Sequence, residues 1–176
     1  GSLRVSASAS TASISARKGA ASAARPSTAA MSRIASAAPA TVRGIVTNTG
    51  SLGMGISKAK GMIFANRLLG REGNVFVLTG DGELQEGQIW ESLVSAANHR
   101  TNELTVIVDH NKLQSDTLVA RVSDLGDLQA KFAAFGWHVA HCDGNDVAAF
   151  ASTLERVRAV KDRPKVVIAD TVKGKG

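Results

Sequence analysis

The chain has 176 residues, of which 44% are hydrophobic and 20% charged, so it can bury a core and is not a wholly disordered chain. Its net charge of +6 is uneven, because residues 1–71 hold ten Lys or Arg and no acid, and the rest hold eleven against fifteen Asp or Glu. The positive charges are scattered and no aromatic residue precedes Phe64, which disfavours nucleic-acid binding. The sequence has no apolar run of about eighteen residues, which excludes a membrane span. Its one cysteine, Cys142, is compatible with a reducing compartment.

The first forty residues are low in complexity, with ten Ser and fourteen Ala. So few large apolar side chains cannot offset the entropy of ordering a packed element. We therefore predict that residues 1–43 are a disordered or low-complexity basic segment outside the native fold. Three origins stay open: an organelle transit peptide, a flexible tail, or out-of-frame translation of GC-rich coding sequence. Because the chain opens on Gly1 rather than Met, we also expect it to be a fragment.

From Gly44 onward, short apolar runs alternate with amphipathic stretches. Apolar runs bounded by glycine or turn residues predict strands, and the longer stretches predict helices. In chain order, these are a strand at 45–47, a helix at 54–69, a strand at 75–79, a helix at 83–99, a strand at 104–108, a helix at 125–135, a strand at 137–142, a helix at 147–160 and a strand at 166–169. Buried strands separated by helices indicate an α/β domain over residues 44–176, with a parallel sheet covered on both faces.

Two polar side chains are expected at the carboxyl edge of this sheet, where ligands of such folds bind. Asp81 lies between Gly80 and Gly82 directly after one strand, and Asn111 follows the next strand thirty residues later. The glycines let the main chain approach an anion, and the following helix offers free N–H groups. Taken alone, Asp81 fits a helix N-cap equally well. Together, the carboxylate and amide oxygens predict a Mg²⁺ or Ca²⁺ site that binds a diphosphate.

These residues also resemble a known family. Gly-Asp-Gly followed by Asn about thirty residues later resembles the signature of thiamine diphosphate enzymes. The strings GDGELQEGQIWE (80–91), DHNKLQ (109–114) and TNTGSLGMGIS (47–57) resemble transketolase, most of all the N-terminal, thiamine diphosphate-binding section of the split bacterial form, truncated at both ends. The resemblance implies two-carbon ketol transfer between sugar phosphates of the pentose phosphate pathway. It also implies thiamine diphosphate and Mg²⁺ (or Ca²⁺) as cofactors, and a cytoplasmic location.

The resemblance assigns a role to each matching residue. Asp81, Asn111 and the carbonyl of Leu113 would be the metal ligands. The cofactor-binding residues would be Gly50, Ser51, Leu52, Gly80, Asp81, Gly82, Glu83 and Asn111, with the first three lining the aminopyrimidine end. The candidate catalytic residues would be Glu86 and Glu91, which resemble acids that link the two active sites of the family's dimer, although Glu91 fits a surface acid equally well. On one continuous helix these two acids would lie about 140° apart.

The chain departs from the family pattern near the reactive end of the cofactor. Family members carry histidines there, yet residues 1–98 contain none. The resemblance implies that the glutamate that activates the aminopyrimidine belongs to a following pyrimidine-binding domain, which we expect this chain to lack. We therefore expect a half-site, inactive alone, whose partner is a C-terminal transketolase subunit or pyrimidine-binding domain, in a homodimer or heterotetramer. Two alternatives stay open: another thiamine diphosphate enzyme, such as 1-deoxyxylulose-5-phosphate synthase, or a degenerate, non-catalytic fragment.

Overall fold

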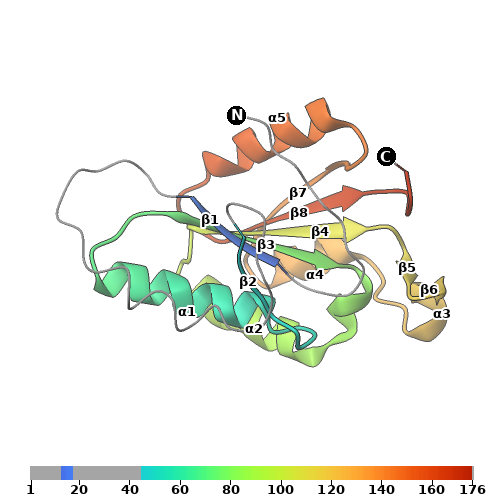
Figure 1. Cartoon of the computed structure of the whole chain (residues 1–176), viewed down its shortest axis with the longest axis horizontal. Helices are drawn as coiled ribbons and strands as arrows, with labels where there is room; N and C mark the ends of the chain where they lie inside the picture. The colour runs from blue at the N-terminus through green and yellow to red at the C-terminus, as the bar shows by residue number, and fades with distance from the viewer. Residues whose placement is uncertain (1–12, 18–44, 176) are drawn as a thin grey trace.

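Four parallel strands form the centre of the structure, a computed structural model that describes residues 13–17 and 45–175 (Figure 1). In spatial order they are β3 (Asn74–Gly80), β4 (Leu104–His110), β8 (Lys165–Asp170) and β7 (His138–Asp143). Each of the four lies where the sequence predicts a strand. The parallel sheet predicted for this chain is therefore confirmed.

Two further strands extend the sheet beside β3. β1 (Ser13–Arg17) pairs antiparallel with β3, and β2 (Ile45–Asn48) pairs antiparallel with β1. The sequence analysis predicted no element at β1, because it identified strands by their apolar side chains. The free edge of a strand offers main-chain groups, which can pair with a segment of any sequence. The other residues before Gly44 lie outside the described part of the chain, so a domain boundary near residue 43 stays a prediction.

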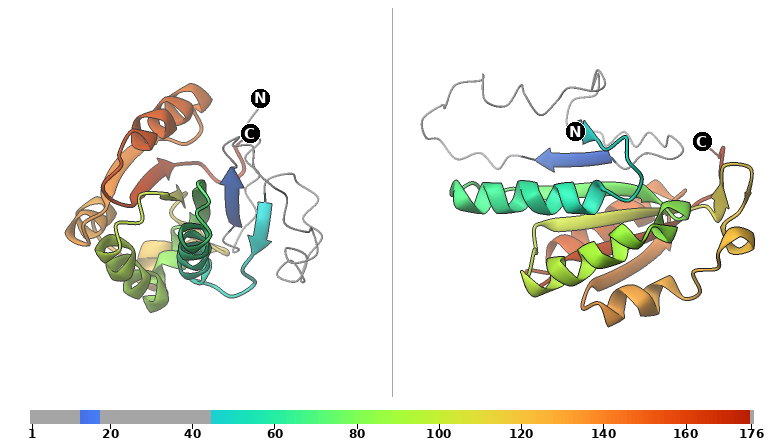
Figure 2. Two further views of the ribbon diagram at one scale, coloured as in Figure 1. Left: turned by 90° about the vertical axis from the view of Figure 1, so that its left-hand side faces the viewer. Right: turned by 90° about the horizontal axis from the view of Figure 1, so that it is seen from below.

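Helices cover the two faces of the sheet unequally (Figure 2). α1 (Gly55–Leu68), α2 (Gly87–Asn98) and α4 (Leu128–Ala134) contribute to one buried cluster, and α5 (Val147–Arg158) contributes to the other. Strand residues alternate between the clusters: Val166 and Ile168 face the three helices, and Val167 and Ala169 face α5. This is the two-sided covering expected for buried parallel strands. Within the described ranges, no helix has the length and apolarity to cross a membrane.

The continuous helix predicted over residues 83–99 is wrong. Gly82–Gln85 form a 3₁₀ helix (η1), Glu86 is extended with φ −74° and ψ 122°, and α2 begins at Gly87. The indole N–H of Trp90 donates to the carbonyl of Leu84 across this corner at 2.8 Å. Glu86 therefore precedes the helix that carries Glu91, and the angle calculated for one helix does not apply.

Three short elements were not predicted, and all follow β4. They are β5 (Leu113–Gln114), β6 (Thr117–Leu118), which pairs antiparallel with β5, and α3 (Val119–Val122). Elements of two to four residues carry too little side-chain periodicity to be recognised. They matter because they shape the loop that follows Asn111.

Candidate active site

The carboxyl ends of β3, β4 and β8 meet at one edge of the sheet, beside the β5–β6 hairpin (Figure 1). The register pairs Gly80 with Asp109, and His110 with Asp170. The segments that follow these strands therefore leave the sheet side by side. The sequence placed Asp81 and Asn111 at this edge, and the structure brings both there.

Asp81 joins the two loops. Its side chain is 2% exposed; Oδ1 accepts the N–H of Gly82 at 2.8 Å, and Oδ2 accepts the N–H of Lys112 at 2.6 Å. Burial raises the pKa of Asp81, and these two hydrogen bonds only partly oppose that shift. Asp81 is thus the N-cap of η1, which is the structural role that the sequence also allowed. It also bridges to Lys112, the residue that follows Asn111.

Asn111 is held within its own loop. Its Oδ1 accepts the N–H of Leu113 at 2.9 Å, and its Nδ2 donates to Asp109 at 3.3 Å. The next residue, Lys112, has φ +65°, in the left-handed region that costs a non-glycine residue energy. Leu113 opens β5. The loop thus keeps an unfavourable main-chain conformation next to the Asp81 carboxylate, and the roles of Asp81, Asn111 and Leu113 as metal ligands stay predictions.

The loop before α1 reaches the same region. Gly50, Ser51 and Leu52 are exposed, and the N–H of Gly53 donates to Glu83 at 2.8 Å. Gly53 has φ +80°, and a Cβ on it would lie 2.9 Å from the Cβ of Glu86. Only glycine fits this position comfortably. The three exposed residues are accessible to a ligand, and their contact with a cofactor stays a prediction.

Glu83 has a structural contact that the sequence did not reveal. It is 4% exposed, and its second carboxylate oxygen accepts the hydroxyl of Thr79 at 2.7 Å. With Gly53 on the first oxygen, both oxygens are engaged by protein donors. Glu83 therefore fastens the loop before α1 to the end of β3. Nothing in a single sequence gives the rotamer that makes this connection, and the predicted cofactor contact of Glu83 stays a prediction.

Glu86 and Glu91 are both exposed. Glu86 lies at the corner beside Gly53, and Glu91 lies on α2. Neither takes part in an ion pair or side-chain hydrogen bond within the described residues. Both carboxylates are therefore accessible, and their predicted role between two active sites stays a prediction.

A second polar cluster at this edge was not predicted. Asp170, the last residue of β8, binds His110 Nδ1 at 2.7 Å and His141 Nε2 at 2.8 Å. Lys112 Nζ lies 3.5 Å from the same carboxylate. Although partial burial acts in the opposite direction, the hydrogen bonds from His141 and His110 lower the pKa of Asp170. Its place at the carboxyl end of a buried apolar run is the sequence signal that could have identified it.

The edge fits a cation bound to a diphosphate. Asp81 and Asn111 offer hard oxygens, which suit Mg²⁺ or Ca²⁺. Gly82 leaves no room for a side chain, since a Cβ would lie 2.7 Å from the Cβ of Gln114. Among the described residues, the buried side-chain atoms without a hydrogen-bond partner are Thr49 Oγ1 and Gln114 Oε1, both in the loops of this edge. Unsatisfied polar atoms at a functional site are consistent with a polar ligand.

The described ranges hold no group of three or more His, Cys, Asp or Glu side chains arranged for a metal ion. The candidate set has a different composition: one carboxylate, one carboxamide and one main-chain carbonyl. A magnesium ion commonly takes few protein ligands and completes its shell with water and phosphate oxygens. The composition of the set is therefore compatible with magnesium.

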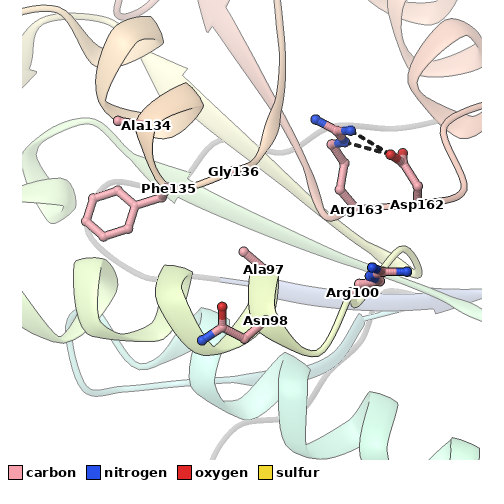
Figure 3. A pocket seen from close by; sticks show the side chains of 8 residues that line it. All are labelled: Ala97, Asn98, Arg100, Ala134, Phe135, Gly136, Asp162 and Arg163. Atoms are coloured by element: carbon pink, nitrogen blue, oxygen red, sulfur yellow. Dashed lines mark hydrogen bonds and ion pairs between the residues drawn. The ribbon is translucent and has the colours of Figure 1, made fainter.

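A separate cavity of about 480 Å³ lies away from this edge (Figure 3). Its lining comes from the end of α2, the end of α4 and the turn before β8, where Arg163 pairs with Asp162 at 2.6 Å. Each of these segments directly precedes a parallel strand, so the cavity is at the amino edge of the sheet. Its position does not match that of ligands in folds of this kind.

Comparison with known proteins identifies a family. The model described as transketolase, thiamine diphosphate binding domain, matches residues 32–176. An apulose-4-phosphate transketolase subunit from Actinobacillus succinogenes is 41% identical over 133 residues, or 76% of this chain and 48% of that protein. The 6-deoxy-6-sulfo-D-fructose transketolase subunit of Clostridium sp. (strain MSTE9) is 38% identical with the same coverage. The chain thus spans about half the length of the curated relatives it matches.

Solved structures agree with this match. A transketolase from Leishmania mexicana superposes with a TM-score of 0.67 at 28% identity, over 73% of this chain and 21% of that one. The parallel sheet and its covering helices are therefore those of the family, as the motifs of the sequence implied.

Proposed function

Because the chain belongs to the transketolase family, through its thiamine diphosphate binding domain, we propose that it binds the magnesium–diphosphate end of thiamine diphosphate. The proposed activity is two-carbon ketol transfer between sugar phosphates, in which the bound cofactor serves as electron sink. One observation carries the proposal: the buried Asp81 carboxylate lies between the N–H groups of Gly82 and Lys112, at the edge where ligands bind.

In this proposal Asp81, Asn111 and the carbonyl of Leu113 hold the metal. Magnesium is the proposed ion, and calcium has the same preference for oxygen. Gly80 and Gly82 leave the main chain open to a diphosphate, because neither carries a side chain. Support comes from Gly80, where a Cβ would meet no heavy atom within 4 Å, whereas a Cβ on Gly82 would meet Gln114 at 2.7 Å, so Gly82 is needed for close packing of the two loops.

The aminopyrimidine end is proposed to lie against Gly50, Ser51 and Leu52. These residues are exposed, and Leu52 offers an apolar surface suited to a ring. Glu83 contributes by holding Gly53, and therefore the base of this loop, through a buried 2.8 Å hydrogen bond. Its role is to orient the residues that contact the cofactor.

The chain is proposed to supply half of a composite site, in the cytoplasm. Its partner would be a C-terminal transketolase subunit or a pyrimidine-binding domain, in a homodimer or heterotetramer, with Glu86 and Glu91 near the shared boundary. The proposal draws support from the relatives, which are named as subunits of transketolases. Their names specify different sugars and therefore select no substrate for this chain; sugar phosphates of the pentose phosphate pathway are our proposed class.

Cofactor binding can be tested by thermal melting with Mg²⁺ and thiamine diphosphate, with and without a pyrimidine-binding partner. A ligand at a hundred times its Kd stabilises the folded state by about 2.7 kcal/mol, or roughly 5–10 °C for a domain of this size. The Asn111→Ala variant should lose most of this rise, because it removes a metal ligand. We expect Asp81→Ala to lose all of it.

The matched control is Asp116→Asn, which removes an exposed carboxylate from the turn between β5 and β6. It should melt at the parent's temperature and keep the parent's response to the cofactor. No rise in the parent, alone or with the partner, would contradict the proposal. A rise that Asn111→Ala and Asp81→Ala both retain would assign binding to other residues.

A further inference from the structure

The strongest unassigned feature is the end of β8, where two consecutive residues bind the segment that contains Asn111. Asp170 lies opposite His110 in the parallel register of β4 and β8. The main-chain N–H of Thr171 donates to the carbonyl of His110 at 3.3 Å, and the Thr171 hydroxyl donates to the Asp109 carboxylate. The end of β8 thus contacts this segment through both main chain and side chains.

The Asp170 carboxylate contacts the residues on both sides of Asn111. On one side, His110 Nδ1 lies 2.7 Å from Oδ1, and because an ionised carboxylate only accepts, this nitrogen donates. On the other side, Lys112 Nζ lies 3.5 Å from the same oxygen. Its other oxygen accepts His141 Nε2 from β7 at 2.8 Å. The carboxylate of Asp170 on β8 therefore contacts β7 through His141 and both neighbours of Asn111, His110 and Lys112.

Thr171 extends the connection to Asn111 itself. Asp109, which accepts the Thr171 hydroxyl on Oδ1, accepts the side-chain amide of Asn111 on Oδ2 at 3.3 Å. The side-chain nitrogen of Asn111 is thereby directed at Asp109, and the side-chain oxygen of Asn111 must then point the opposite way. The orientation of the Asn111 oxygen thus depends on a chain of two hydrogen bonds that begins at Thr171.

The conformation of Lys112 shows why such support is needed. At φ +65° a lysine is in a region that side chains disfavour, yet in this conformation its N–H donates to Asp81 at 2.6 Å. If Lys112 relaxed to a more favourable conformation, its N–H would leave Asp81, and the contact that holds the Asn111 loop against Asp81 would be lost. The ion pair with Asp170 opposes that relaxation.

We infer that Asp170 and Thr171 are positioning residues of the candidate metal site, and that they hold residues 109–112 in the turn that directs Asn111 and Leu113 toward Asp81. The inference rests on the proposed function. Neither residue contacts the metal or the cofactor in this arrangement. Groups that orient metal ligands commonly change affinity by ten- to a hundredfold when they are removed.

The test measures the apparent Kd for Mg²⁺ at saturating thiamine diphosphate, using the full chain with its pyrimidine-binding partner. Asp170→Asn keeps the shape of the side chain and removes its charge, and Thr171→Val removes only the hydroxyl. We expect each variant to raise the apparent Kd roughly tenfold. Asp143→Asn, at the end of β7, removes a carboxylate from the same edge and should leave the Kd unchanged.

A second measurement distinguishes positioning from general loss of stability. Amide hydrogen exchange without ligand should be faster over residues 109–118 in Asp170→Asn, because Lys112 is no longer held in the conformation in which its N–H donates to Asp81. Exchange over residues 54–69, which include α1, should match the parent. Faster exchange in both segments would mean general destabilisation and would overturn the inference.

The remaining outcomes separate the two proposals. If the parent binds and both Asp170→Asn and Thr171→Val bind equally well, the positioning role is overturned and the cofactor site stands. If Asp143→Asn weakens binding as much as Asp170→Asn, the effect is one of net charge and the positioning role is again overturned. If the parent binds no magnesium with thiamine diphosphate, the proposed function fails and the inference fails with it.

Discussion

Lys165 is a charged residue placed where charge is unfavourable. It opens β8 with 2% exposure, and its ammonium donates to the carbonyls of Asn102 and Val160. Burial, together with the nearby charge of Lys161, lowers the pKa of Lys165 to about 8. Since the unfolded chain keeps an ordinary lysine, the unfolded state binds more protons than the folded state between about pH 8 and 10.5.

The free energy of unfolding should therefore rise with pH across that window. The contribution of Lys165 is on the order of 3 kcal/mol at most, and it is absent below pH 8, where both states are protonated. Urea denaturation between pH 7.5 and 10 would measure it. Lys165→Met should remove the rise, and Lys175→Met, at an exposed lysine, should keep it. Equal slopes in the two variants would contradict the assignment.

At residue scale, the positions of the candidate ligands follow from the parallel arrangement of the strands, which the sequence predicts. Asp81 and Asn111 each follow a buried apolar run, and parallel neighbours deliver such residues to one edge. The contacts of Glu83 and Asp170 could not be predicted in the same way. They depend on which rotamer each carboxylate adopts and on which neighbour is in reach, and periodicity carries neither.

At the scale of elements, Arg67 connects the end of α1 to the turn between α2 and β4. Its guanidinium forms a two-pronged pair with Glu103, both contacts at 2.7 Å, and donates to the carbonyls of His99 and Arg100. The hydrogen bond with Glu103 raises the pKa of Arg67. One side chain thus satisfies carbonyls at the end of α2 that its own main chain leaves free.

Arg67→Met should lower the free energy of unfolding by about 1 kcal/mol. Both the ion pair and the hydrogen bonds to the two carbonyls are at least partly exposed, so water replaces the lost donors in part and the loss stays small. Arg67→Lys should recover less than half, because an ammonium cannot match the planar fork. Urea denaturation checks both. Arg71→Met removes an exposed arginine and should be near neutral, and a loss equal to that of Arg67→Met would contradict the argument.

Elements were predicted to the extent that side-chain burial defines them. β3, β4 and β8 are apolar runs and were found within one or two residues of their ends. The corner at Glu86 was missed because apolar spacing continues across it, while the main chain turns to let Trp90 bond to Leu84. β1 was missed because main-chain pairing defines it.

At the scale of the whole molecule, we propose that this chain provides one end of a binding site. The sequence holds four histidines. His99 packs against Phe64 at the far end of α2, and His138 opens β7 at the amino edge. The remaining two, His110 and His141, are hydrogen-bonded to Asp170 beside the segment that contains Asn111. Under the proposed function, proton transfer to a sugar carbanion is therefore expected to depend on groups outside these 176 residues.

The partner requirement can be tested by complementation. The chain alone should not turn over xylulose 5-phosphate with an aldose phosphate acceptor, even with Mg²⁺ and thiamine diphosphate present. Addition of a separately purified pyrimidine-binding subunit should produce turnover that saturates as the two chains reach equal concentrations. The reason is that the acid that activates the aminopyrimidine belongs to that subunit in the family. Turnover by the unaided chain, or a mixture in which Asp81→Ala is as active as the parent, would contradict a composite site anchored by this chain.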